Sequence, residues 1–272
     1  MESCLYLHKT VTFLMRKIQM VDLKSQYNFI QDEVQTELQK VLETTSFING
    51  PAVKEFQVEL EKYLGVKHVI PCANGTDALQ IALMGLKLQP GDEVITADFT
   101  FAATVEVISL LQLKPVLIDV DSQTFNLDPT RIEAAITPKT KAIIPVHLFG
   151  QAADMDTINS IAAKHNLYVV EDNAQGIGAR YANKKGEKMM TGTLGHIAAT
   201  SFFPSKNLGA YGDGGAIFTN DDALAHFIRR IVNHPMYKRY YHDVVGVNSR
   251  LDSMQAAILK VKLKYLDFYN ER

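Results

Sequence analysis

The stretch AIIPVHLFGQAADMDTINSIAAKHNLYVVED, Ala142–Asp172, carries two apolar runs separated by a segment with helical spacing. The runs Ala142–Val146 and Leu167–Val170 are short and continuously apolar, which is typical of strands buried on both faces. After Asp154, a suitable N-cap residue, apolar residues recur on one helix face: Met155, Ile158, Ile161 and Ala162. A strand, a helix and a second strand in this order predict a right-handed βαβ unit, and therefore parallel strands.

The same alternation continues on both sides of this unit. Further strands are predicted in short apolar segments: Val94–Ala97, Pro115–Val120, Ala198–Phe203 and Ala216–Thr219. Helices are predicted where apolar residues recur at helical spacing: Leu23–Leu42, Thr76–Met84, Thr104–Leu111 and Leu251–Leu266. Ser46–Pro51 is predicted to be a loop between two such elements. The predicted fold class is α/β, a three-layer α/β/α domain built on a mostly parallel, mixed sheet.

The composition excludes several classes of protein. With 272 residues, 47% hydrophobic and 21% charged, the chain can bury a substantial core. A formal net charge of -2 gives no basic surface for nucleic acid or membrane. The two cysteines, Cys4 and Cys72, form no disulfide framework or metal motif, and we expect a cytoplasmic location.

The two ends of the sequence are interpreted separately from the centre. Residues 1–20 are interrupted by His8 and Lys9 and lack a small-residue cleavage site, so they are predicted to be a disordered extension and not a signal peptide. Residues 21–250 form the predicted large domain with its N-terminal helix. Residues 251–272 follow a helical pattern to the last residue. We interpret them as the start of a helix that leads to a small C-terminal domain whose remainder is absent.

Three polar features follow predicted strands, and ligands of parallel sheets bind at such strand ends. The first is CANGTDAL, Cys72–Leu79, where a strand-like segment passes into a helix. Backbone N–H groups of Gly75 and Thr76 at that helix start could bind a phosphate. By itself the motif is also compatible with an ordinary turn.

The second feature is Asp172 in VVEDNAQGIGA, and the third is Lys206 in SFFPSKNLGAYGDGG. A carboxylate at the end of a buried strand needs a cationic partner if it is ionised, although it could instead cap a turn. A lysine in a partly desolvated site has a lowered pKa and can form a Schiff base with a carbonyl. Its alternative is a solvated loop position. A Walker phosphate loop is excluded, because Ser205 stands where that motif requires glycine.

Taken together, the three features fit one ligand: a phosphorylated, cationic heteroaromatic aldehyde. The helix start would bind its phosphate, Asp172 its protonated ring nitrogen and Lys206 its aldehyde. Phe99 or Phe101 could stack on the ring. Pyridoxal 5'-phosphate has this chemistry.

Seven ordered blocks carry a resemblance to a known family. The sequence resembles the DegT/DnrJ/EryC1/StrS family of pyridoxal-phosphate-dependent nucleotide-sugar aminotransferases, which have the fold type I of aspartate aminotransferase. The resemblance runs from about Val21 to the last residue. The blocks are FINGPAVKEF, CANGTDAL, FTFAAT, PVHLFGQAADM, VEDNAQGIGA, TSFFPSKNLGAYGDGGA and VGVNSRLDSMQAAIL.

The resemblance implies roles for residues around the cofactor. Lys206 would bind the cofactor covalently and then move a proton, and Asp172 would pair with the ring nitrogen. Gln175 would approach the ring hydroxyl, and Phe101 would stack on the ring. The phosphate would be bound by Gly75, Thr76 and Ser201.

The resemblance also implies a homodimer with shared active sites. Asn248 would reach the phosphate in the neighbouring subunit, and Arg250 would touch the substrate there. Thr45 and Phe47 are further candidates for substrate contact.

The implied reaction moves an amino group from an amino acid, such as L-glutamate, to a keto carbon of a nucleotide-linked sugar. Within the family the blocks most resemble enzymes that act on UDP-linked 3-keto sugars for surface polysaccharide or O-antigen synthesis. One alternative is a sugar dehydratase or deoxygenase, in which histidine replaces the Schiff-base lysine, so Lys206 argues against it. Another is a catalytically silent regulatory homologue. No metal site is predicted, because the histidines show no metal-ligand spacing.

Overall fold

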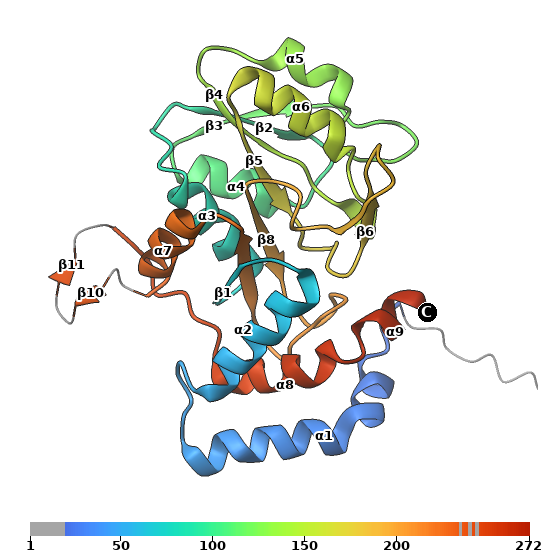
Figure 1. Cartoon of the computed structure of the whole chain (residues 1–272), viewed down its shortest axis with the longest axis vertical. Helices are drawn as coiled ribbons and strands as arrows, with labels where there is room; N and C mark the ends of the chain where they lie inside the picture. The colour runs from blue at the N-terminus through green and yellow to red at the C-terminus, as the bar shows by residue number, and fades with distance from the viewer. Residues whose placement is uncertain (1–19, 234–235, 239–240, 243–244) are drawn as a thin grey trace, which may run out of the picture.

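The computed structural model describes residues 20–233, 236–238, 241–242 and 245–272 (Figure 1). Its centre is a seven-stranded sheet with the order β1-β9-β8-β5-β4-β2-β3. The strands are β1 His68–Cys72, β2 Glu93–Ala97, β3 Lys114–Ile118, β4 Thr140–Ile144, β5 Tyr168–Asp172, β8 Ile197–Ser201 and β9 Gly215–Thr219. Every strand predicted from the sequence is present, with bounds shifted by a few residues.

Strand direction brings the carboxyl ends of most strands to one edge. The pairs β2–β3, β2–β4, β4–β5 and β5–β8 are parallel, as the βαβ pattern predicts. β9 runs antiparallel to both β8 and β1, so β1 points in the same direction as β8. The carboxyl ends of β1, β8, β5, β4 and β2 therefore meet at the same edge.

Helices cover both faces of this sheet. Their bounds are α1 Leu23–Thr44, α2 Pro51–Leu64, α3 Gly75–Gly85, α4 Ala102–Leu110, α5 Ile132–Ala135, α6 Met155–His165, α7 Asp222–Ile231, α8 Ser253–Leu263 and α9 Leu266–Glu271. Short 3-10 helices span Pro129–Arg131 and Leu148–Gly150, and small two-stranded sheets are formed by β6 Arg180–Ala182 with β7 Lys188–Met190 and by β10 Met236–Lys238 with β11 Tyr241–His242.

Successive side chains of each strand enter different cores, as the pleat requires. On one face α3, α4 and α7 pack on the sheet, and Ile70, Val170 and Ile217 contribute to that core. On the opposite face α2 and α8 cover β1, β8 and β9, with Val69 and Phe218 in their core. The α6 helix covers the other half of that face. The structure is the predicted three-layer α/β/α arrangement.

The helices differ from the predictions in several places, and α5 and α7 were not predicted. Residues after Pro51 form α2, which the sequence interpretation did not include, although Pro51 stands at the first helical position and the buried residues recur at helical spacing: Ala52, Phe56, Leu60 and Leu64. The helix predicted at Leu251–Leu266 begins at Ser253 and breaks after Leu263. At the break Tyr265 donates a hydrogen bond to Glu33 of α1, and Leu266 is buried.

Helix α1 lies outside the other layers and packs on α8 (Figure 1). Ile30 and Val34 of α1 are buried against Ile258 and Val261 of α8. Residues 1–19, most of the predicted extension, lie outside the described residues. The division of the chain at residues 250 and 251 stays a prediction. No described helix combines the length and apolarity needed to cross a membrane.

Candidate active site

A cavity of about 720 Å³ opens at the edge where the strand ends meet. The residues that line it come from the ends of β1, β5 and β8 and from the loops that follow β2 and β4. Among the residues predicted from the sequence, it is lined by Gly75, Thr76, Phe101, Asp172, Gln175, Ser201 and Lys206. Residues far apart in the sequence are therefore brought together as predicted.

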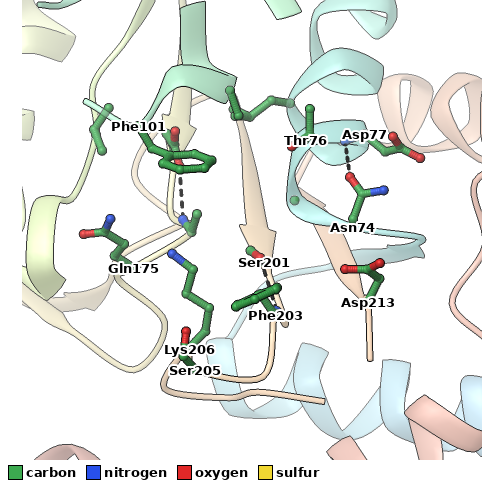
Figure 2. Close-up of a pocket in the computed structure, with 16 residues that line it drawn as sticks. Asn74, Thr76, Asp77, Phe101, Gln175, Ser201, Phe203, Ser205, Lys206 and Asp213 are labelled. Atoms are coloured by element: carbon green, nitrogen blue, oxygen red, sulfur yellow. Dashed lines mark hydrogen bonds between the residues drawn. The ribbon is translucent and has the colours of Figure 1, made fainter. Parts of the chain in front are cut away.

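The start of α3 forms one wall of the cavity (Figure 2). Asn74 caps this helix, because its Oδ1 accepts a hydrogen bond of 2.8 Å from the N–H of Asp77. The backbone is held close to β8: a Cβ added to Gly75 would lie 2.6 Å from the Cβ of Ser201. The helix start therefore has the close backbone approach and the free N–H groups that a bound phosphate requires.

Asp172 lies at the carboxyl end of β5 and is 4% exposed. Its Oδ2 accepts a hydrogen bond from the Thr104 hydroxyl at 2.8 Å, and its Oδ1 accepts one from the N–H of Ala174 at 3.1 Å. Burial raises the pKa of Asp172, whereas these two donors and the charge of Lys206 act in the opposite direction. A desolvated carboxylate held at the cavity wall is suited to bind a cation that enters the cavity.

Lys206 lies on a tight loop between β8 and β9. The N–H of Lys206 donates to the carbonyl of Phe203 at 2.8 Å, and the N–H of Ala210 donates to that of Phe202 at 2.7 Å. Figure 2 shows the Lys206 side chain extending toward Gln175 and the Phe101 ring. Burial lowers the pKa of Lys206, and the charge of Asp172 partly opposes this shift. The amine is thus easier to deprotonate than a solvated lysine, as a nucleophile needs.

Gln175 is oriented by a backbone group. Its Oε1 accepts a hydrogen bond of 2.7 Å from the N–H of Phe149, a residue with a left-handed φ of 55°. The carbonyl end of the amide is therefore engaged, and the NH₂ end is the donor available to a ligand.

Of the two phenylalanines considered for the ring face, Phe101 lines the cavity and is 70% exposed. Phe99 lies outside the lining residues, where its ring is 5.8 Å from that of Phe125. The exposed ring of Phe101 is apolar surface available to a flat ligand.

The residues predicted to contact the substrate, and Asn248, predicted to reach the phosphate of the neighbouring subunit, are not in this cavity. Thr45, Phe47, Asn248 and Arg250 form a second group on neighbouring loops, and none of them lines the cavity of their own chain. The two loops are joined where Ile48 bridges Asp252 and where the N–H of Ser253 donates to the carbonyl of Phe47 at 2.9 Å. The guanidinium of Arg250 donates to Asn233 at 3.5 Å.

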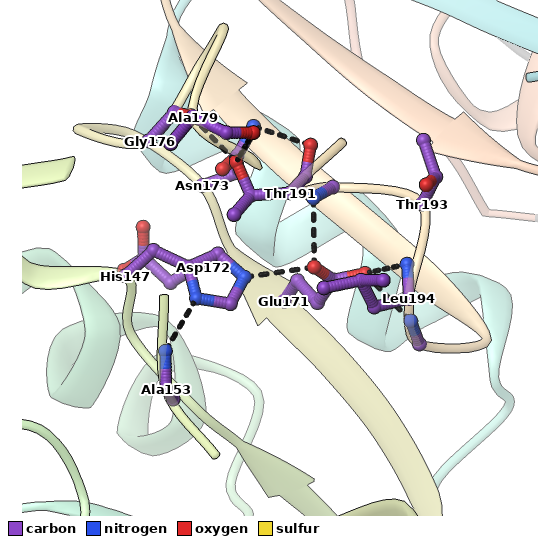
Figure 3. A network of polar contacts seen from close by, with 12 residues as sticks. His147, Ala153, Glu171, Asp172, Asn173, Gly176, Ala179, Thr191, Thr193 and Leu194 are labelled. Carbon is purple, nitrogen blue, oxygen red and sulfur yellow. Dashed lines mark hydrogen bonds and ion pairs between the residues drawn. The ribbon is translucent and has the colours of Figure 1, made fainter. Parts of the chain in front are cut away.

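A fully buried network braces the strand that carries Asp172 (Figure 3). The Glu171 carboxylate accepts three backbone hydrogen bonds of 2.6–2.7 Å, from the N–H groups of Gly192, Leu194 and Gly195. His147 Nδ1 accepts from the N–H of Ala153, so its Nε2–H donates to Glu171 at 2.7 Å. His147 is thus a hydrogen-bonded core residue. Glu171 was missed, although a charged residue inside an apolar strand was a signal for it.

We expect Glu171→Gln to lower the free energy of unfolding by about 3 kcal/mol, because the carboxylate has two oxygens that accept four hydrogen bonds, whereas an amide has only one acceptor oxygen. Denaturant unfolding of the cofactor-free protein would measure this change. Glu59→Gln, the same substitution at an exposed position of α2, serves as the control. Equal stabilities of the two variants would contradict the prediction.

The residues of the cavity fit pyridoxal phosphate. The buried Asp172 carboxylate has acceptor capacity toward the cavity, the helix start at Gly75 suits a phosphate, and Lys206 is half-buried with a lowered pKa. A fold type I sheet with a lysine, a carboxylate and a phosphate-binding helix start defines a pyridoxal-phosphate-dependent enzyme.

Comparison with known proteins gives the family. The model of the DegT/DnrJ/EryC1/StrS aminotransferase family matches residues 28–272, and the chain belongs to this family. It is therefore a pyridoxal-phosphate-dependent aminotransferase, and the cofactor and the fold predicted from the sequence are confirmed.

Three relatives are informative. The chain is 54% identical to the UDP-2-acetamido-2-deoxy-3-oxo-D-glucuronate aminotransferase of Pseudomonas aeruginosa over 92% of this chain and 68% of that protein. It is 51% identical to a protein of Geobacillus stearothermophilus named pleiotropic regulatory protein, over 94% of this chain and 67% of that one. The crystal structure of S. venezuelae DesV in complex with a ketimine intermediate superimposes with a TM-score of 0.90 at 40% identity, over 94% of this chain and 68% of DesV.

Proposed function

We propose that this aminotransferase moves an amino group from L-glutamate to the keto carbon of a UDP-linked 3-keto sugar, for surface polysaccharide or O-antigen synthesis in the cytoplasm. The observation that carries the proposal is the single cavity in which Lys206, Asp172 and the start of α3 meet. The 54% identity to an aminotransferase named for a UDP-linked 3-oxo-glucuronate supports the substrate class.

Bound pyridoxal phosphate supplies a carbonyl that accepts the amino group and a ring that accepts the electrons of the broken bond. Lys206 acts on this cofactor in two ways. Its amine would hold the cofactor at the carbonyl carbon, and the same amine would take and return the substrate proton. The lowered pKa of Lys206 favours both roles near neutral pH.

Asp172 keeps a proton on the ring nitrogen. The carboxylate is buried, so its attraction to that proton is not screened by water. Thr104 and the N–H of Ala174 hold its two oxygens in place. The NH₂ group of Gln175 would donate to the ring oxygen, and Phe101 would cover one face of the ring.

The phosphate is bound by Gly75, Thr76 and Ser201. We expect Thr76→Val to weaken the binding of pyridoxal phosphate about 10-fold or more, because a hydrogen bond to a charged group contributes about 1.5–3 kcal/mol. Binding of pyridoxal, which lacks the phosphate, should stay unchanged. Equilibrium dialysis with both compounds measures this, and Thr36→Val on α1 is the control. Equal weakening of both compounds would contradict the phosphate role.

The second residue group, Thr45, Phe47, Asn248 and Arg250, belongs to the site of a partner subunit in a homodimer. Its position outside the cavity of its own chain supports this assignment. The two loops lie side by side at the chain surface, with Phe47 44% exposed.

Shared sites predict complementation between two inactive variants. Lys206→Ala and Arg250→Ala homodimers should each be inactive, whereas mixed and reassociated protein should regain up to about a quarter of the unchanged activity, because half of the molecules are heterodimers with one intact site each. Activity of the mixture that equals the sum of the separate variants would contradict shared sites.

The function itself is tested with holoenzyme of the full protein. L-glutamate should convert the bound cofactor to its amine form, which bleaches its visible absorbance, and a UDP-linked 3-keto sugar should restore the absorbance with formation of a UDP-linked amino sugar. A 4-keto sugar nucleotide is the control substrate. A protein that binds pyridoxal phosphate but transfers no amino group to either sugar would contradict the proposal.

A regulatory function is the alternative that the name of the Geobacillus relative raises. Lys206, Asp172 and Gln175 are all present and line the cavity, so nothing in the described site distinguishes this chain from a working aminotransferase. The same lysine argues against a dehydratase of this family.

A further inference from the structure

Lys262 is a buried lysine in α8. Its side chain is among the largest that are fully buried, with 0% exposure. The neighbouring lysines behave differently: Lys260 of α8 pairs with Glu37 and Glu55, and Lys264, directly after α8, pairs with Glu33 at 2.9 Å. Among the described residues no carboxylate lies within ion-pair distance of Lys262. Burial of an ammonium group without a carboxylate partner lowers the stability of the fold, which suggests that Lys262 is kept for a function.

The ammonium group of Lys262 is directed at the loop that carries Lys206. Its Nζ donates a hydrogen bond to the carbonyl of Gly209 and lies 5.4 Å from the centre of the Tyr211 ring. Gly209 follows Lys206 by three positions in the chain. Burial lowers the pKa of Lys262 to about 8, and either protonation state retains an N–H donor for this carbonyl.

Gly209 itself is held tightly by the first half of the loop. A Cβ at this position would lie 2.2 Å from the carbonyl oxygen of Pro204, so the two sides of the loop touch through their backbones. Because the backbones of Gly209 and Pro204 are in contact, a displacement of Gly209 would also displace the backbone segment that carries Lys206.

The same helical segment makes two further bonds to the loop. Gln255 of α8 accepts from the N–H of Tyr211 at 2.9 Å, and Asn270 of α9 accepts from the Asn207 side chain at 2.7 Å. Lys262 is the one of the three that is fully buried, and it therefore contributes the bond that water competes with least.

We propose that Lys262 is a positioning residue. Its hydrogen bond from α8 to the Gly209 carbonyl would hold the loop in the conformation that places the Lys206 amine next to the cofactor carbonyl. This inference rests on the proposed role of Lys206. It concerns attachment of the cofactor and the rate of proton movement, and not the binding of the phosphate, which lies at the start of α3.

The test compares Lys262→Met, which fills the same apolar space without a donor, with Lys264→Met as the matched control at the exposed position that follows α8. Two quantities are measured on cofactor-free full protein, and kcat and the KM values are measured on the holoenzyme. One is the rate at which added pyridoxal phosphate becomes trappable by borohydride on Lys206. The other is the affinity for pyridoxamine phosphate, which binds without attachment to the lysine.

For Lys262→Met we expect the attachment rate and kcat to fall about 10- to 100-fold, the range that a misplacement near 1 Å produces, while the affinity for pyridoxamine phosphate and the KM values stay close to those of the unchanged protein. Lys264→Met should leave all of these unchanged. Lys262→Gln keeps a donor on a shorter side chain, so its attachment rate and kcat should lie between those of Lys262→Met and the unchanged protein. If Lys262→Met does not fold, Lys262→Gln is the deciding variant.

The proposal is overturned if the deciding variant keeps the attachment rate, or if it loses pyridoxamine phosphate affinity by the same factor, because the second result would indicate a structural role alone. Failure of the unchanged protein to attach the cofactor at Lys206 would instead contradict the proposed function, so the two failures are distinguishable.

Discussion

Lys206→Ala should abolish covalent attachment of pyridoxal phosphate and lower the transamination rate by at least about 10²–10⁴-fold, the contribution of a positioned proton-transfer group. The half-buried Lys206 amine has a lowered pKa and extends into the cavity beside Gln175 and Phe101 (Figure 2). Among the residues that the structure describes, no other lysine lines the cavity. The loop should keep its conformation, because the bond from residue 206 to the Phe203 carbonyl is made by the backbone.

Mass spectrometry after borohydride reduction measures attachment, and coupled glutamate consumption measures turnover. Lys185→Ala, in the exposed turn between β6 and β7, is the control and should behave as the unchanged protein. A reduced cofactor found on a different lysine of the Lys206→Ala variant would show that the nucleophile is misassigned. Retained affinity for pyridoxamine phosphate would show that the cavity is intact.

Asp172→Asn should lower the transamination rate by about 10²–10³-fold, the range observed when one preorganised electrostatic group is removed. An asparagine fits the hydrogen bonds of this position. Its carbonyl can accept from the N–H of Ala174, and its NH₂ can donate to the Thr104 hydroxyl, which in turn lies 3.0 Å from the Thr100 hydroxyl. The substitution therefore removes the charge and keeps the local packing.

Two measurements separate this loss of charge from a loss of structure. Burial raises the pKa of Asp172, so a neutral amide at the same position should leave the melting temperature of the cofactor-free protein unchanged or slightly higher. Attachment to Lys206 should persist. Asp119→Asn, on an exposed carboxylate, is the control. Activity of Asp172→Asn equal to that of the control would contradict the assigned role.

Strands and the main cavity residues could be predicted from the sequence, for a physical reason. Strands buried on both faces are short apolar runs, and the end of each run shows which polar residue reaches the sheet edge. Asp172 and the start of α3 follow from this rule alone. The assignment of Gln175, Ser201 and Phe101 depended on the family resemblance.

Other features depend on tertiary contacts that a linear pattern does not contain. The antiparallel direction of β9 follows from its pairing with β1 and β8. β8 directly precedes β9 among the strands of this sheet, whereas β1 lies far away in the sequence. Phe99 and Phe101 are equivalent in a strand-end pattern, and in the structure it is Phe101 that lines the cavity. Lys262 stands in a helical pattern between Lys260 and Lys264, which both form ion pairs, so its burial without a carboxylate could not be expected.

The position of β1 has a consequence for the order in which this protein folds. Among the described strands β1 pairs only with β9, and Asn74 at its end packs on Gly215, where an added Cβ would lie 2.3 Å from the Asn74 carbonyl oxygen. During synthesis from the N-terminus, β1 and the helix start after it therefore cannot pair with β9 until most of the chain has left the ribosome. Long-range pairings of this kind form slowly. A nascent chain that ends before Gly215 should be unable to retain the cofactor, and cofactor capture should mark the completion of folding.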